Sequence, residues 1–218
     1  MKNKFNLIVT ILAVLVFGNL VMAQNNEDAE KEVESKIDAK VRRASIGEAT
    51  VINDKMLSEL RESKCPLGLN QTITAGINDN LLAPNEPTFK SPALTILFPN
   101  TKTFDDPSVN KIFAHSFPLK HYKPCQSEAC RASLLLRVCN SGQDLWKNDK
   151  IYVGSANNGV FTSSFFAGIF WNQNGSEAKQ CKTLNIPLNP LSLGGLSFLD
   201  VVMQDDSTID YMQLVLNY

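Results

Sequence analysis

From Cys65 to the end of the chain, short apolar runs alternate with segments rich in proline, glycine, asparagine and threonine. A fold of alternating strands and helices would need long helical segments between the strands, and this part of the sequence has none. We therefore expect a mainly β domain, an antiparallel β-sandwich or jelly roll, over residues 65–218. The predicted strands are 71–75, 93–98, 112–117, 133–138, 151–154, 160–171, 183–187, 196–203 and 209–218.

Two of these runs show the two-residue period of a β-strand. Over residues 132–139 the even positions are all aliphatic, and in the last run the side chains that share a face are Met212, Leu214, Leu216 and Tyr218. This pattern predicts the one-sided burial that is typical of antiparallel sheets. The run 160–171 is ambiguous, because its clustered aromatic residues would also suit a buried helical turn.

Residues 1–23 have the organisation of a cleavable signal peptide, with two lysines, an apolar core over 7–17 and Ala23 at the end. The apolar core is shorter than the roughly 20 residues that a transmembrane helix needs, although an uncleaved anchor is the competing interpretation. Cleavage would start the mature protein near Gln24 in a secreted, periplasmic or cell-envelope location. No later segment is long and apolar enough to span a bilayer.

Residues 24–64 are predicted to form a helical extension before the β domain. Over 26–45 apolar side chains recur at every fourth position, which gives one narrow apolar stripe on an amphipathic helix. Acidic residues crowd its first turns and arginines its last, as the helix dipole favours. Such a stripe buries little surface, so we expect the helix to pack on the domain, to pair with a second copy, or to fray. A second short helix is predicted over 54–63.

The charge balance argues against nucleic acid as a partner. The chain has 21 basic and 22 acidic residues, and removal of the signal segment takes away two of the lysines. Nucleic-acid-binding proteins normally carry a basic excess or a basic stripe, and this sequence has neither.

Five cysteines follow the signal segment, at positions 65, 125, 130, 139 and 181. Disulfides are the default for cysteines in an oxidising compartment, and the odd number leaves one thiol free or available for an intermolecular bridge. Cys125 and Cys130 are the pair that is easiest to close, because only a short loop separates them. A metal site built on cysteine would need a second paired cluster or more than the two histidines of this chain.

Asp205, Asp206 and Asp210 lie close together at a predicted hairpin. Carboxylate oxygens are the ligands that calcium prefers, so these residues are a candidate calcium site, and calcium is the one cofactor that the sequence suggests. The competing interpretations are a solvated turn and a catalytic carboxylate. Alternation places Asp210 on the apolar face of the last strand. We therefore expect it near the core, paired with backbone N–H groups, a cation or a basic side chain such as Arg137.

Trp146, Asn148 and Asp149 form a candidate ligand-binding cluster in a polar loop. The indole could stack on a sugar ring while the amide and the carboxylate bind hydroxyl groups. The competing interpretation is that Trp146 folds back over the edge of the sheet.

Motifs for catalysis are sparse in this sequence. It contains neither a G-x-S-x-G nucleophile motif nor an H-E-x-x-H zinc motif. His115, flanked by Phe113 and Phe117, is expected to be a hydrogen-bonded structural histidine rather than a general base. We name no catalytic residue, although a pair of carboxylates can be recognised only from geometry.

Three classes of function are compatible with these observations. The first is a secreted, non-catalytic module that binds carbohydrate or another cell-surface ligand. The second is a secreted hydrolase that acts on glycan or ester substrates with a carboxylate pair. The third is an envelope-associated structural or assembly protein that self-associates through residues 26–45.

Overall fold

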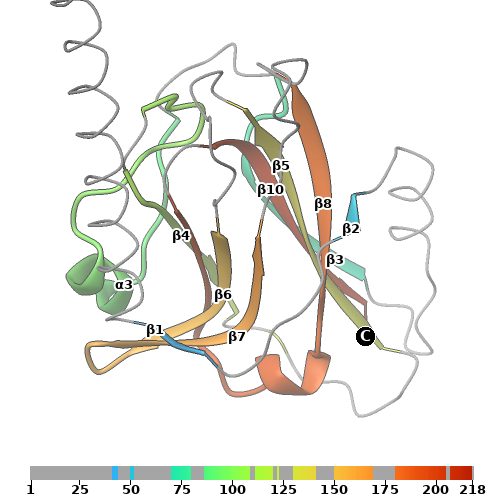
Figure 1. Ribbon diagram of the computed structural model, residues 1–218. Coiled ribbons are helices and arrows are strands. Elements are labelled where there is room, and N and C mark those ends of the chain that lie inside the picture. The colour runs from blue at the N-terminus through green and yellow to red at the C-terminus, as the bar shows by residue number, and fades with distance from the viewer. Residues whose placement is uncertain are drawn as a thin grey trace, which may run out of the picture.

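The structure is a computed structural model of the chain (Figure 1). It describes residues 41–43, 50–51, 70–79, 86–108, 111–119, 122, 130–140, 150–168, 180–204 and 207–217. The signal segment 1–23 and the predicted helix 54–63 lie outside these residues. Among the described residues, no helix is long and apolar enough to cross a membrane.

Ten strands, one short α-helix and one 3-10 turn make up the described part of the chain. The strands are β1 (Val41–Arg43), β2 (Thr50–Val51), β3 (Asn70–Gly76), β4 (Phe113–Pro118), β5 (Arg131–Cys139), β6 (Lys150–Asn157), β7 (Val160–Gly168), β8 (Cys181–Leu188), β9 (Phe198–Met203) and β10 (Thr208–Asn217). The helix is α3 (Pro92–Leu97), and the 3-10 turn is η1 (Pro190–Leu193).

Eight of these strands form two four-stranded antiparallel sheets that pack as a sandwich, as Figure 1 shows. One sheet has the order β7-β6-β9-β4, and the other has the order β8-β5-β10-β3. The core between them is aliphatic and aromatic, with side chains such as Leu136, Met203 and Leu214 fully buried. The mainly β sandwich expected from the sequence is confirmed.

The burial pattern of β5 confirms the inner face that alternation predicted but not an exposed outer face. Leu134, Leu136 and Val138 belong to the core, as expected. However, Leu135 on the opposite face is also fully buried, and Ser133 is nearly so. The second sheet is therefore covered on both faces at these positions.

The predicted strand 93–98 is wrong, because α3 occupies Pro92–Leu97. Ser91 is its N-cap, with the side-chain Oγ accepting a hydrogen bond from the Leu94 N–H at 3.2 Å, and Pro92 occupies the first turn. Both are strong helix-start signals, and they outweigh the β-like apolar run. The helix packs Leu94 and Leu97 against Tyr152 on the outer face of the first sheet, in a second small core.

Two short strands from the N-terminal part of the chain extend the sheets. β1 pairs in parallel with β7, and β2 pairs antiparallel with β8. The amphipathic helix predicted over 26–45 therefore does not include Val41–Arg43; residues 26–40 lie outside the described part of the chain. Val41–Arg43 form a strand rather than a helix because the open edge of β7 offers unpaired backbone N–H and C=O groups to a neighbouring segment.

Candidate functional site

Gly76 ends β3 and turns the chain towards the start of β10. Its φ is 77°, and a Cβ at this position would lie 2.6 Å from the carbonyl oxygen of Asp210. Only glycine fits this close approach without strain. The turn places Asp79 beside β10, and the Asp79 N–H donates to Oδ1 of Asp210 at 3.4 Å.

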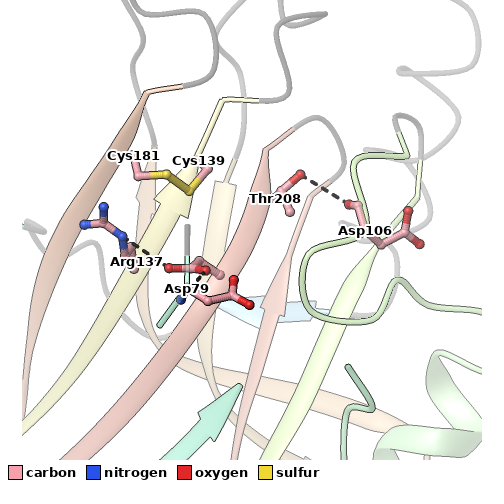
Figure 2. Close-up of a disulfide and its surroundings, with 7 residues drawn as sticks. Asp79, Asp106, Arg137, Cys139, Cys181 and Thr208 are labelled. Carbon is pink, nitrogen blue, oxygen red and sulfur yellow. Dashed lines mark hydrogen bonds and ion pairs between the residues drawn. A yellow bond between two sulfur atoms is a disulfide. The ribbon is translucent and has the colours of Figure 1, made fainter. Parts of the chain in front are cut away.

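β3 pairs with β10 up to Gly76. Beyond that point, the segment 102–106 lies beside β10 instead. The Asp105 N–H donates to the Ile209 carbonyl oxygen at 3.0 Å, and Thr208 Oγ1 donates to the Asp106 carbonyl oxygen at 3.2 Å, an interaction drawn in Figure 2. Lys102 is buried and donates from Nζ to the Ser207 carbonyl oxygen at 3.1 Å. These bonds fix the backbone of Asp105 against the strand that carries Asp210.

Asp210 is the extra residue of a β-bulge. Ile209 pairs with Val138 and Tyr211 pairs with Arg137, so the register of β10 shifts by one residue against β5. Strict alternation predicts that Asp210 lies on the core face with Met212, and this is wrong because the bulge turns its side chain out of that register. The carboxylate is fully buried all the same, and its Oδ2 lies 3.2 Å from Nε of Arg137, which is labelled in Figure 2. The expected pairing with Arg137 is confirmed.

Three carboxylates therefore converge where β3, the segment 102–106 and β10 meet. Asp79, Asp105 and Asp210 each offer an oxygen within 4.8 Å of the others. Burial, together with the negative charges of Asp210, Asp79 and Glu86, raises the pKa of Asp105 to about 7. Asp79 and Asp105 were not recognised from the sequence as partners of Asp210. Asp205 and Asp206, the other predicted calcium ligands, lie outside the described residues.

A disulfide joins the two neighbouring strands beside this cluster. Cys139 and Cys181 are directly opposite each other on β5 and β8, and Figure 2 shows their bond near the ends of these strands. Cys130 is also disulfide-bonded, and its partner lies outside the described residues, as does Cys125 of the predicted Cys125–Cys130 bridge. Disulfides of this kind are typical of an oxidising extracellular or periplasmic environment.

An apolar groove lies at the opposite end of β3, on the side of the sandwich where β3 and β4 are the outermost strands. Its volume is about 500 Å³. Three of its described lining residues are aromatic, and one of them, Phe89, is 49% exposed. The described lining residues are Gln71, Ile73, Phe89, Pro118, Leu119, Tyr122 and Phe198.

The aromatic residues of the groove are held in place by hydrogen bonds and ring contacts. The rings of Phe89 and Phe198 lie 5.9 Å apart between centroids and are tilted by 41°. The hydroxyl of Tyr122 donates to the Pro190 carbonyl oxygen at 3.1 Å. The carbonyl oxygen of Phe89 accepts a hydrogen bond from the Ser116 N–H at 2.7 Å.

His115 anchors the other backbone group of Phe89. Its Nδ1 accepts a hydrogen bond from the Phe89 N–H at 3.2 Å, which requires the imidazole to be neutral at that nitrogen. Edge contacts with Phe104 and Phe117 enclose the ring, and burial lowers the pKa of His115 to about 4. The hydrogen bond expected for this histidine is confirmed.

Asp200 is a second buried carboxylate, and it serves as a structural link. Its side chain accepts hydrogen bonds from Ser116 Oγ, from Ser91 Oγ at 3.4 Å and from the Ala156 N–H at 2.7 Å. Burial nevertheless raises the pKa of Asp200. Because Ser91 caps α3, this network fastens the helix to the three strands beneath it.

The predicted ligand-binding cluster of Trp146, Asn148 and Asp149 lies outside the described residues. The groove and the acidic cluster are two candidate sites within the described part of the chain. The groove gave no signal in the sequence, because its lining comes from segments that only the strand order brings together. Comparison of the chain with protein-family models, curated proteins and solved structures finds no match.

Proposed function

We propose that this protein is an exported, non-catalytic binding module and that the groove between β3 and β4 binds a carbohydrate of the cell surface. The observation that carries the proposal is the groove itself, with two aromatic rings fixed side by side and one of them half exposed. Pockets of this size lined by aromatic side chains with a few polar groups are the usual form of small-ligand sites.

The strand order supports a binding function by analogy. Between β3 and β10, successive strands change sheet at every step except β6 to β7. This is the order of a jelly roll with two Greek keys, an architecture found in lectin domains and cupins. An architecture alone does not determine a function, so the analogy adds weight only together with the groove.

The chemistry of the lining suits a sugar ring. The rings of Phe89 and Phe198 offer apolar surface on which a pyranose ring can stack. Their faces also carry partial negative charge, which attracts the C–H groups of the sugar. Gln71 and Tyr122 supply polar atoms to the lining. The hydrolase alternative gains no support here, since the described lining of the groove contains no carboxylate and Asp105 and Asp210 are both buried.

The signal segment and the disulfide support export. The apolar segment 7–17 and Ala23 predict a mature protein that begins near Gln24, and N-terminal sequencing of the exported protein tests this. The bridge between Cys139 and Cys181 fits the same compartment.

A glycan array probed with the purified protein tests the binding function. We expect selective binding to a few glycans, and we expect Phe89→Ala to lower the affinity by about fivefold or more, because removal of a central aromatic contact commonly costs over about 1 kcal/mol. Ile96→Ala is the matched control, since Ile96 is 76% exposed on α3 and does not line the groove. Absence of glycan binding would contradict the proposed ligand, and equal binding by Phe89→Ala would contradict the site.

A further inference from the structure

We propose that Asp79, Asp105 and Asp210 bind one divalent cation, with Ca²⁺ as the best fit, where the end of β3 and the segment 102–106 meet β10. This site is independent of the groove, which lies at the other end of β3. It shares Asp210 with the calcium site predicted from the sequence, but its other two ligands come from distant parts of the chain.

The spacing of the carboxylates suits a single ion. Ca²⁺ binds oxygen at 2.3–2.6 Å, so two oxygens on one ion are separated by at most about 5 Å. The oxygens that Asp79, Asp105 and Asp210 offer all lie within 4.8 Å of one another. One ion between them can therefore reach all three without a rearrangement of the backbone.

Asp105 supplies the second observation that points to a ligand. Asp105 is only 3% exposed, and neither of its carboxylate oxygens accepts a hydrogen bond from an N–H or O–H donor among the described residues. Its one described hydrogen-bonding neighbour is the carboxylate of Asp210, which can share a proton with it but offers no donor of its own when ionised. A buried carboxylate without a partner is costly. Arg137 and the Asp79 N–H contact Asp210.

The charge of the cluster matches a divalent ion. Three ionised carboxylates carry three negative charges, and Arg137 neutralises one of them through its contact with Asp210. The remaining two charges equal the charge of one divalent cation. Glu86 is held nearby, with its Oε2 accepting a hydrogen bond from the Ile77 N–H at 2.7 Å, and it adds to the negative field at Asp105.

The donor atoms favour calcium over other metals. All three side chains offer oxygen, the ligand type of hard cations, and none of them is a histidine or a cysteine, which zinc and copper prefer. Mg²⁺ requires near-ideal octahedral geometry and keeps most of its water, whereas Ca²⁺ accepts irregular sets of carboxylates. The competing occupant is a proton held between Asp105 and Asp210.

Calorimetry and thermal melting distinguish the two occupants. Protein freed of metal with EDTA and dialysed to pH 7.5 is titrated with CaCl₂, and melting is followed with and without Ca²⁺. We expect saturable binding at one site and a melting temperature that rises with Ca²⁺. Titration with MgCl₂ should show weaker binding.

Asp105→Asn is the decisive variant, because it keeps the shape of the side chain and removes its charge. It should weaken Ca²⁺ binding by more than about tenfold, since even a change beside the ligands of a metal commonly has that effect. The matched control is Asp106→Asn, whose carboxylate instead accepts hydrogen bonds from Ser108 and should leave Ca²⁺ binding unchanged.

Three results would overturn the proposal. The first is an absence of any Ca²⁺ response in the wild-type protein. The second is a wild-type Ca²⁺ response that persists in Asp105→Asn, which would place the ion elsewhere, for example at Asp205 and Asp206. The third is equal loss of binding in Asp105→Asn and Asp106→Asn, because a general disturbance of the loop would then explain the effect.

Discussion

Arg137 and Asp210 form an ion pair, 3.2 Å between Nε and Oδ2, at the point where β10 carries one more residue than β5. The two partners differ in environment, because the side chain of Arg137 is 26% exposed while that of Asp210 is fully buried. Asp210 also lies among the other carboxylates of the cluster, and Arg137 does not. Loss of one partner is therefore not equivalent to loss of the other.

We predict that Arg137→Met destabilises the protein more than Asp210→Ala when metal is removed with EDTA. The arginine variant leaves a buried carboxylate beside two others and should cost about 3 kcal/mol, the lower end for a broken buried pair because Arg137 is partly exposed. The alanine variant orphans Arg137 and the Asp79 N–H but relieves the repulsion, so it should cost about 1–2 kcal/mol.

Denaturant unfolding of the two variants and of the double variant measures these costs. Arg131→Met, at the exposed other end of β5, is the control and should stay within about 0.5 kcal/mol of wild type. A larger cost for Asp210→Ala than for Arg137→Met would show that repulsion among the carboxylates is not a significant cost.

The second prediction concerns acid stability. The pKa of His115 is lowered to about 4 in the folded protein, from 6.5, so the unfolded chain binds the proton more readily between these values. The contribution of His115 to the free energy of unfolding is therefore fully present above about pH 6.5 and is lost as the pH falls towards 4. The free energy of unfolding that is lost in full is about 3 kcal/mol, because each unit of difference between the folded and unfolded pKa corresponds to about 1.4 kcal/mol.

His115→Asn tests this prediction, because the amide oxygen can accept the Phe89 N–H without titrating. The variant should lose less stability than wild type between pH 6.5 and 4, measured by urea unfolding in EDTA. An NMR titration should place the imidazole pKa of His115 near 4. An imidazole that titrates near 6.5 would contradict the prediction.

The third prediction is that the disulfide between Cys139 and Cys181 contributes strongly to stability. The cysteines are 42 residues apart in sequence, and a closed loop of this length corresponds to about 4 kcal/mol of chain entropy in the unfolded state. The double variant Cys139→Ala and Cys181→Ala should fold, because the neighbouring strands keep their backbone pairing, but its urea midpoint should fall. An unchanged midpoint would contradict this expectation.

The fourth prediction concerns the remaining cysteines. Cys139, Cys181 and Cys130 are all in disulfides, so we expect one of the two remaining cysteines, Cys65 or Cys125, to bridge to Cys130 and the native protein to have one reactive thiol. The short spacing predicts that the partner is Cys125. Thiol counting and peptide mapping of non-reduced protein test both statements, and a Cys65–Cys130 peptide would contradict the second.

The fifth prediction concerns the two short strands at the sheet edges. Deletion of residues 24–51 removes β1 and β2 and exposes the edges of β7 and β8, so the domain should still unfold cooperatively but should self-associate. Deletion of residues 24–40 keeps both strands and is the control. Light scattering after gel filtration measures the difference, and a monomer after the longer deletion would contradict the role of these strands.

The sandwich could be predicted from the sequence because burial of one face leaves a local, two-residue pattern, as in Leu134 and Leu136. The helix α3 was missed because a mostly apolar run of six residues is too short to show a helical period. Its start signals, Ser91 and Pro92, lie outside the run itself.

The acidic cluster shows a different limit of sequence reasoning. Alternation located Asp210 near the core and suggested Arg137 as its partner, and both are correct. The bulge breaks the alternation of β10, and no residue type in the sequence signals it, so the predicted face of Asp210 was wrong. Asp79 is 131 residues from Asp210, and nothing local in either segment signals that they meet. The bridge between Cys139 and Cys181 likewise depends on strand register, whereas loop length favoured Cys125 and Cys130.

The position of β10 has a consequence for the timing of folding. It follows the other nine described strands in sequence, yet it lies between β3 and β5 in the interior of the second sheet. A chain that is still being synthesised or translocated from its N-terminus lacks the strand that joins these two. Because pairing between distant segments is slow, the incomplete chain presents open strand edges until β10 emerges. Emergence of β10 therefore sets the moment at which the sandwich can close.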